Sequence, residues 1–241
     1  MIKTAVIPAA GKGTRMLNVA ANKPKHLIKI KEHPFLYYVL SNLKAAGIEK
    51  MILVVGHKKE QMEEFAKEHA DKFDITLVDQ FETAGTERYG TAIPIQCVRD
   101  IVGNEGFVSL FGDNLYSPDD IRAIAVDDDF CYTSVMEHEH PEKYGVIVPE
   151  GEHLAELVEK PKTFISNLIS TGLHKFTPEV FDAVDRVEKS ARGEYELTDA
   201  IKSLARERKV KIKRISDYWL DFGNPGDIIK MWHFVNKHNL K

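Results

Sequence analysis

The stretch VIPAAGKGTRML, residues 6–17, places a glycine-rich turn directly behind a short apolar run. Gly11 and Gly13 would let the backbone approach a phosphate closely, and Lys12 and Arg15 would supply cationic donors to it. A turn of this kind can also be a simple connection between two elements. Its interpretation therefore depends on the sequence around it.

Two familiar phosphate-binding loops do not match this turn. A dinucleotide-binding loop needs a third glycine where Met16 stands, which argues against a dinucleotide-dependent oxidoreductase, and the Walker pattern GxxxxGK[ST] is absent. Further along, Pro24 stiffens the backbone in front of Lys25. A rigidly held lysine near a cationic glycine turn favours a polyphosphate ligand.

Outward from the turn, short apolar runs alternate with helical patterns. Four runs precede residue 114, namely TAVIPA (4–9), MILVVG (51–56), ITLVDQ (75–80) and FVSLFGD (107–113). Amphipathic segments at 34–48 and 58–73 separate the first three, an alternation typical of a parallel, doubly wound sheet. Ligands usually bind at the carboxyl ends of such strands, where the glycine turn lies. From about residue 131 the strands become shorter, so we predict a mixed sheet.

Composition excludes several other classes of protein. The 241 residues are 43% hydrophobic and 29% charged, as in ordinary globular proteins. The formal net charge of -4 gives no reason to expect nucleic acid or an anionic membrane as a partner. No stretch approaches the ~20 apolar residues of a membrane span, so we expect a cytoplasmic protein without membrane contact. Cys97 and Cys131 are predicted to be buried thiols.

Together, AAGKGTRM (9–16) and PKHL (24–27) resemble the signature of the nucleotidyltransferases that join a sugar 1-phosphate to a nucleoside triphosphate, GxGTR followed by PK. Further motifs follow in the order of that family: ERYGTAI (87–93), LFGDN (110–114), KYGVIV (143–148), ELVEKPK (156–162), STGLHKF (170–176) and YWLDFGNP (218–225). Asn18 and Ala20 depart from the family, which often has Pro and Thr there.

The resemblance implies a single nucleotidyltransferase domain over residues 1–241, with the Rossmann-like fold of nucleotide-diphospho-sugar transferases. Residues 1–130 would mainly bind the nucleotide, and residues 131–241 would mainly bind the sugar and form the C-terminal helix. Asn224 is predicted to cap that helix and Pro225 to be its first residue. No hexapeptide repeat follows residue 220, so a left-handed β-helix domain is not expected.

The motif GDN places the carboxylate of Asp113 at the same sheet edge as the glycine turn. A carboxylate repels a neighbouring phosphate unless a cation intervenes, and Mg²⁺ is the natural bridge. The resemblance implies that Asp113 and Asp221 together hold Mg²⁺. Nothing in the sequence alone brings these two residues together, and a turn is the simpler interpretation of either.

The resemblance also implies which residues bind the nucleoside triphosphate. The amide of Gln80 can match the edge of uracil or thymine, and Gly90 would let the base lie on the backbone. The implied nucleotide-binding residues are Ala10, Gly11, Lys12, Gly13, Thr14, Arg15, Gln80, Gly90 and Thr91.

Glu159 and Lys160 stand where a predicted strand ends, so both can enter a cleft. The resemblance gives Glu159 the sugar hydroxyls and Lys160 the sugar phosphate, roles that suit a carboxylate and an ammonium. The implied sugar-binding residues are Asn114, Gly145, Glu159, Lys160, Thr171 and Gly172. Thr198 is predicted to cap a helix, and His138 and His140 to lie in a solvated turn.

The reaction implied by the resemblance is an in-line, Mg²⁺-assisted displacement of pyrophosphate by the sugar phosphate, with Arg15, Lys25 and Lys160 as catalytic residues. UTP or dTTP is the expected nucleotide, and glucose 1-phosphate or N-acetylglucosamine 1-phosphate the expected acceptor. Two alternatives stay open: a phosphocholine-type cytidylyltransferase, and a catalytically silent nucleotide-sensing subunit on the same fold. A homo-oligomer is also left open.

Overall fold

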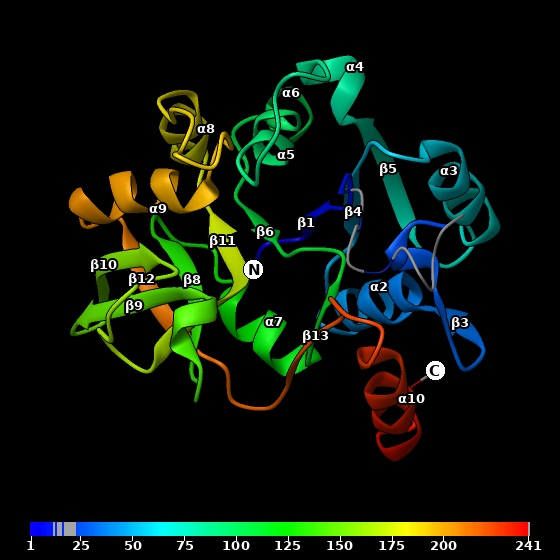
Figure 1. Ribbon diagram of the computed structural model, residues 1–241. Coiled ribbons are helices and arrows are strands. Elements are labelled where there is room, and N and C mark those ends of the chain that lie inside the picture. Colours follow the sequence, from blue (N-terminus) through cyan, green and yellow to red (C-terminus); the bar gives the residue numbers. More distant parts are fainter. Residues whose placement is uncertain (12, 14–15, 17–22, 241) are drawn as a thin grey trace.

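The computed structural model describes residues 1–11, 13, 16 and 23–240 (Figure 1). Within them, the main sheet has nine strands. In spatial order these are β5 (Asp74–Asp79), β4 (Lys50–Val55), β1 (Thr4–Pro8), β6 (Phe107–Ser109), β11 (Leu168–Phe176), β8 (Cys131–Glu137), β12 (Val210–Arg214), β10 (His153–Glu159) and β9 (Gly145–Glu150). Two small sheets pair β7 (Asn114–Tyr116) with β13 (Trp219–Asp221), and β2 (Lys29–Ile30) with β3 (His33–Pro34).

Helices cover the sheet on both sides (Figure 1). They are α2 (Phe35–Ala45), α3 (Lys59–Glu68), α4 (Gln80–Ala84), α5 (Ile93–Gln96), α6 (Arg99–Val102), α7 (Pro118–Ile124), α8 (Glu179–Asp185), α9 (Leu197–Arg206) and α10 (Asp227–Lys237), with short 3-10 turns η2 (Lys25–Leu27) and η3 (Pro141–Lys143). None of these described helices has the length and apolar character that crossing a bilayer requires.

The alternation of side chains along the central strands explains the two-sided packing. In β1, Ala5 and Ile7 belong to a core shared with α2, α7 and α10, whereas Val6 belongs to a core shared with α5, α8 and α9. Successive strand residues point to opposite faces, so an all-apolar strand needs helices on both faces. The predicted α/β fold with a doubly wound sheet is confirmed.

The direction of the strands changes in the second half of the chain. β5, β4, β1 and β6 are parallel, whereas β11 runs antiparallel to β6 and β8. β9 pairs with both β10 and β11, so the five strands β11, β8, β12, β10 and β9 form a ring of pairings. The mixed extension predicted from residue 131 onward is present, but the expectation of shorter strands was wrong: β8 has 7 residues and β11 has 9, against 5 in β1. Strands from both halves of the chain therefore belong to one sheet.

The beginning of the last helix differs from the prediction. α10 starts at Asp227 with Gly226 at its N-cap, rather than at Pro225 with Asn224 as the cap. The Asp227 carboxylate accepts the backbone N–H groups of Gly223 and Asn224, at 3.1 and 2.8 Å. These bonds hold the preceding residues in a turn, and a proline and asparagine in a turn have the same sequence signature as a helix start.

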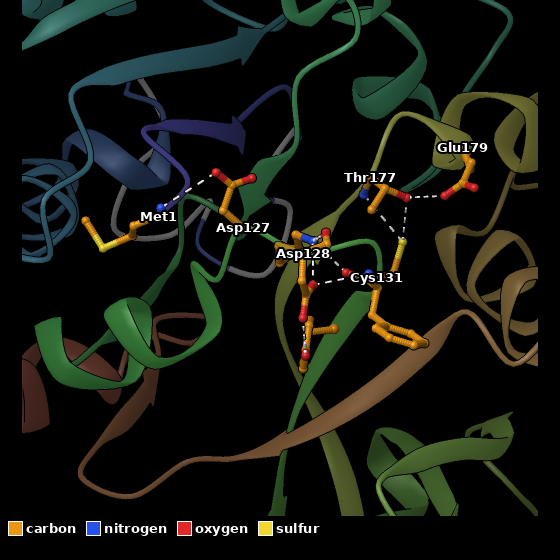
Figure 2. Close-up of polar contacts among 9 residues, drawn as sticks. Met1, Asp127, Asp128, Cys131, Thr177 and Glu179 are labelled. Carbon is orange, nitrogen blue, oxygen red and sulfur yellow. Dashed lines mark hydrogen bonds and ion pairs between the residues drawn. The ribbon is translucent and has the colours of Figure 1, made fainter.

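A cluster of polar contacts joins β11 and the residues after it to the segment that enters β8 (Figure 2). Lys175 is 1% exposed and donates to the backbone and carboxylate oxygens of Asp128, at 2.5 and 3.1 Å. Cys131 Sγ lies 3.4 Å from Thr177 Oγ1, which donates to Glu179 at 2.6 Å. Both cysteines of the chain are free and buried, as predicted, and burial raises the pKa of the Cys131 thiol.

Candidate active site

A cavity of about 580 Å³ lies where β1 and β6 end, and it reaches across to the end of β10 and the middle of β11. It is lined by fourteen of the predicted site residues: Ala10, Gly11, Lys25, Gln80, Gly90, Thr91, Asp113, Asn114, Gly145, Glu159, Lys160, Thr171, Gly172 and Asp221. Gly13 is not among the lining residues. Lys12, Thr14 and Arg15 lie outside the described residues.

Lys25 lines the cavity and is fixed by its neighbours. Pro24 in front of it has an extended backbone, and Lys25 is the first residue of η2. Gly13, at φ +59°, lies over the lysine stem, so that a Cβ there would be 3.5 Å from Lys25 Cβ and Cγ. The Lys25 ammonium donates to Asp113 Oδ2, and both side chains are only 14% exposed. The predicted phosphate-binding lysine is thus paired with the predicted metal ligand.

The two predicted metal ligands are neighbours although 108 positions separate them in the chain. β7 pairs with β13 so that Asp221 lies opposite Asn114, and the N–H of Phe222 donates to the Asp113 carbonyl at 2.8 Å. Burial raises the pKa of Asp113, but the charge and hydrogen bond of Lys25 outweigh it and hold that pKa below its ordinary value. Asp113 is therefore ionised at neutral pH.

The donor set in this part of the cavity fits Mg²⁺. Among the described residues, no group of three or more His, Cys, Asp and Glu side chains could hold a metal by itself. Asp113 and Asp221 both line the cavity. One or two carboxylates completed by substrate phosphates are what Mg²⁺ usually takes, so two aspartates are a suitable set.

Asn114, predicted to bind the sugar, has its amide engaged by the protein. Its Nδ2 donates to Asp113 Oδ1 at 3.1 Å, and its Oδ1 accepts from Trp219 Nε1 at 2.6 Å. The residue is 8% exposed. It connects the indole of β13 to the Asp113 carboxylate.

Gln80 is a cavity residue rather than an exposed strand end. It is 3% exposed and is the first residue of α4. Asp79 fixes this helix start, because its Oδ1 accepts the N–H groups of Phe81 and Glu82 at 2.8 and 3.2 Å. Lys59 pairs with the same carboxylate at 2.7 Å. The cap therefore fixes the backbone at the start of α4, where Gln80 is the first residue.

Gly90 and Thr91 join the two halves of the chain. Gly90 has φ +138°, and a Cβ there would overlap the backbone of Tyr195. Thr91 Oγ1 accepts the N–H of Leu197, the first residue of α9, at 2.8 Å. The glycine is needed for close backbone packing in addition to any contact with a base, a reason that the sequence did not suggest.

Three of the predicted sugar-binding residues, Gly145, Glu159 and Lys160, lie together at the end of β10. Glu159 is paired in register with Gly145, and a Cβ on that glycine would lie 3.3 Å from the Glu159 carboxylate. Burial raises the pKa of Glu159, although Lys160 and Arg192 act to lower it. The backbone of Lys160 has φ +44°. Its Nζ lies 3.8 Å from Glu159 Oε1, and its side chain is 52% exposed. The strand ends here, as predicted, and both side chains line the cavity.

Thr171 and Gly172 lie at an irregularity of β11, where the register with β8 shifts between residues 170 and 174. Gly172 has φ +89° and sits against the ring of Phe111. The Thr171 hydroxyl lies 2.5 Å from Ser134 Oγ. The register shift and the positive φ account for a glycine at position 172 by the backbone alone, apart from any contact with a sugar.

Several residues that line the cavity were missed in the sequence, among them Arg192, Thr198 and His26. Arg192 pairs with Glu196 at 2.9 Å and lies 3.8 Å from Glu159. Thr198 is the second residue of α9 rather than its cap, which is Glu196, and its buried Oγ1 has no hydrogen-bond partner among the described residues. Burial, with Lys25 nearby, lowers the pKa of His26 to about 4. In the sequence, the signal for His26 is its position directly after Lys25 of the PK motif.

Residues 4–238 match the family described as nucleotidyl transferase, and the chain belongs to that family. Its relatives and its fold place it among the sugar-1-phosphate nucleotidyltransferases, which confirms the assignment made from the motifs.

The bifunctional protein GlmU of Methanocaldococcus jannaschii is 36% identical over 238 residues, which cover 98% of this chain and 54% of that protein. The UTP–glucose-1-phosphate uridylyltransferase AglF of Haloferax volcanii is 35% identical over 232 residues, which cover 92% of each chain. A crystal structure of UDP-glucose pyrophosphorylase complexed with UDP-glucose has a TM-score of 0.85 at 25% identity, covering 99% of this chain and 100% of that one. The chain thus spans about half the length of the GlmU relative.

Proposed function

We propose that this protein transfers a nucleotidyl group from UTP or dTTP to a sugar 1-phosphate and releases pyrophosphate. The observation that carries the proposal is the composition of one cavity. Lys25, Asp113 and Asp221 line one part of it, and Glu159 and Lys160 line another. The names of AglF and of the UDP-glucose pyrophosphorylase support glucose 1-phosphate and UTP as the first substrates to test.

The residues on the nucleotide side would bind the triphosphate. A Cβ on Gly11 would meet no described atom within 4 Å, so this glycine leaves open space in the cavity, where a phosphate could approach the backbone. Lys25 would exchange the Asp113 carboxylate for a phosphate oxygen when the nucleotide enters. Asp113 and Asp221 would hold Mg²⁺, which when bound neutralises phosphate charge. Arg15 stays a predicted catalytic residue.

The acceptor phosphate would be held by Lys160 and Arg192, the cations beside Glu159. One of its oxygens attacks the α-phosphorus, and the bond from that phosphorus to the oxygen bridging to the β-phosphorus breaks. Pyrophosphate leaves with that oxygen, so no covalent enzyme intermediate is needed. The chain's residues contribute positioning and charge rather than a nucleophile.

Lys160→Met is expected to raise the KM for the sugar phosphate by roughly 10- to 100-fold, because a hydrogen bond to a charged group is lost. The KM for the nucleotide should change little. Lys162→Met, on the exposed segment that follows, is the matched control and should leave both constants unchanged. Equal effects of Lys160→Met on both substrates would contradict the assignment.

Gln80→Leu is expected to raise the KM for UTP about tenfold and to weaken discrimination against CTP, because a base-reading amide is replaced by an apolar group of similar size. Gln96→Leu, on α5 outside the cavity, is the control. Steady-state kinetics with both nucleotides give the comparison. Unchanged discrimination would remove Gln80 from base recognition.

Phosphocholine remains a second candidate acceptor because of one observation. Tyr144 and Trp219 line the cavity with ring centroids 5.7 Å apart. Two aromatic rings near a carboxylate suit a quaternary ammonium as well as a sugar face. Mg²⁺-dependent pyrophosphate release, measured with glucose 1-phosphate and with phosphocholine, separates the two. The cytoplasmic location and the division into a nucleotide half and a sugar half stay predictions, and the oligomeric state stays open.

A further inference from the structure

Trp219 and Asn114 form a hydrogen-bonded chain that ends on Asp113. The indole Nε1 of Trp219 donates to Asn114 Oδ1 at 2.6 Å, and Asn114 Nδ2 donates to Asp113 Oδ1 at 3.1 Å. All three residues line the cavity. The chain therefore links an aromatic side chain of β13 to the carboxylate that we propose as a metal ligand.

The chemistry of the donors fixes the direction of these two hydrogen bonds. An indole N–H can only donate, so the Asn114 amide must turn its oxygen toward Trp219 and its NH₂ group toward Asp113. A flipped amide would place two donors together and an oxygen against a carboxylate. Asp113 Oδ2 accepts from Lys25, so each carboxylate oxygen has a donor of its own. The orientation of the carboxylate is thus set from both sides.

The backbone keeps Trp219, Asn114 and Asp113 close together. Trp219 lies opposite Tyr116 and Asp221 lies opposite Asn114 in the antiparallel pair of β13 and β7. The ring of Tyr144 packs edge-on against Trp219, with centroids 5.7 Å apart. The strand pairing thus fixes the backbone of Trp219 next to β7, and the ring of Tyr144 packs against its indole.

We propose that Trp219 is a positioning residue for the metal site, acting through Asn114 on Asp113. The proposal rests on the proposed function, because it takes Asp113 as a ligand of Mg²⁺. Partners that orient a metal ligand typically contribute about 10- to 100-fold to metal affinity. On this account the Asn114 amide serves the metal ligand rather than the sugar.

The test is Mn²⁺ binding, followed by electron paramagnetic resonance, to protein saturated with UTP and without sugar phosphate. Trp219→Phe keeps an aromatic ring and removes the donor, and it is expected to weaken Mn²⁺ binding about tenfold. Trp219→His, which keeps a ring N–H, should lose less. Trp232→Phe removes an indole that is 47% exposed on α10 and should change nothing. Because no sugar is present, a Trp219 role confined to sugar packing would not alter the result.

Asn114→Leu, alone and combined with Trp219→Phe, completes a double-mutant cycle. The effect of Trp219→Phe should vanish in the Asn114→Leu background, since the connecting amide is gone. Unchanged Mn²⁺ affinity in folded Trp219→Phe, or an equal loss in both backgrounds, would overturn the positioning role alone. Failure of the unmodified protein to bind Mn²⁺ with UTP would instead overturn the metal site on which the proposed function depends.

Discussion

Asp113→Asn should lower kcat/KM about 1,000-fold while the protein stays folded. The substitution keeps the shape of the side chain and removes the negative charge that we propose to hold Mg²⁺, a loss of roughly 4 kcal/mol of transition-state stabilisation. It also leaves the Lys25 ammonium, only 14% exposed, without its carboxylate. Some thermal stability is therefore lost as well, and activity should be measured well below the melting temperature, with circular dichroism as the check on folding.

The matched control for this variant is Asp119→Asn. Asp119 lies on α7, its side chain is 78% exposed, and it pairs with Arg122 one turn along the same helix. An exposed pair of this kind contributes little, so activity and melting temperature should stay close to those of the unmodified protein. A folded Asp113→Asn protein with nearly normal, Mg²⁺-dependent turnover would exclude Asp113 as a metal ligand.

Gly90→Ala should destabilise the protein by about 3 kcal/mol or more, and should lower the melting temperature by roughly 10 °C for a chain of this length. The new Cβ would overlap the backbone of Tyr195, which has no flexible end that could move aside. A φ of +138° adds strain of its own. Because Tyr195 precedes the start of α9, the displacement should also distort the cavity and reduce activity.

Gly85→Ala separates the effect of a positive φ from the effect of overlap with a neighbouring backbone. Gly85 also has a positive φ, +77°, but a Cβ there would meet no described atom within 4 Å. It should cost about 1 kcal/mol from backbone strain alone. Thermal unfolding of both variants gives the comparison. Equal melting temperatures would show that backbone contact at Gly90 is not the source of the effect.

The parallel half of the sheet could be predicted from the sequence because its signal is local. Runs such as 51–56 are apolar at every position, and only a strand covered on both faces tolerates that. The end of β10 could be predicted for a similar reason. Pro161 directly follows Glu159 and Lys160, and a proline has no backbone N–H to donate to a neighbouring strand. Each of these inferences needs only neighbouring residues.

The arrangement of the site depended on contacts between distant residues. Neither segment carries a sequence pattern that predicts the pairing of β7 with β13, which brings Asp113 beside Asp221. The hydrogen bond from the Leu197 N–H at the start of α9 to Thr91 could not be predicted for the same reason, since donor and acceptor lie in different halves of the chain. The start of α10 was wrong because a turn and a helix start share proline and asparagine.

The central claim is tested most directly by pyrophosphate release in the presence of Mg²⁺, with UTP, dTTP, CTP, GTP and ATP each combined with glucose 1-phosphate, N-acetylglucosamine 1-phosphate, mannose 1-phosphate and phosphocholine. The proposed function predicts release with UTP or dTTP that requires both a sugar 1-phosphate and Mg²⁺. Release only from CTP with phosphocholine would contradict the sugar assignment. No release from any pair, with folded protein, would contradict the transferase itself and favour a nucleotide-sensing subunit.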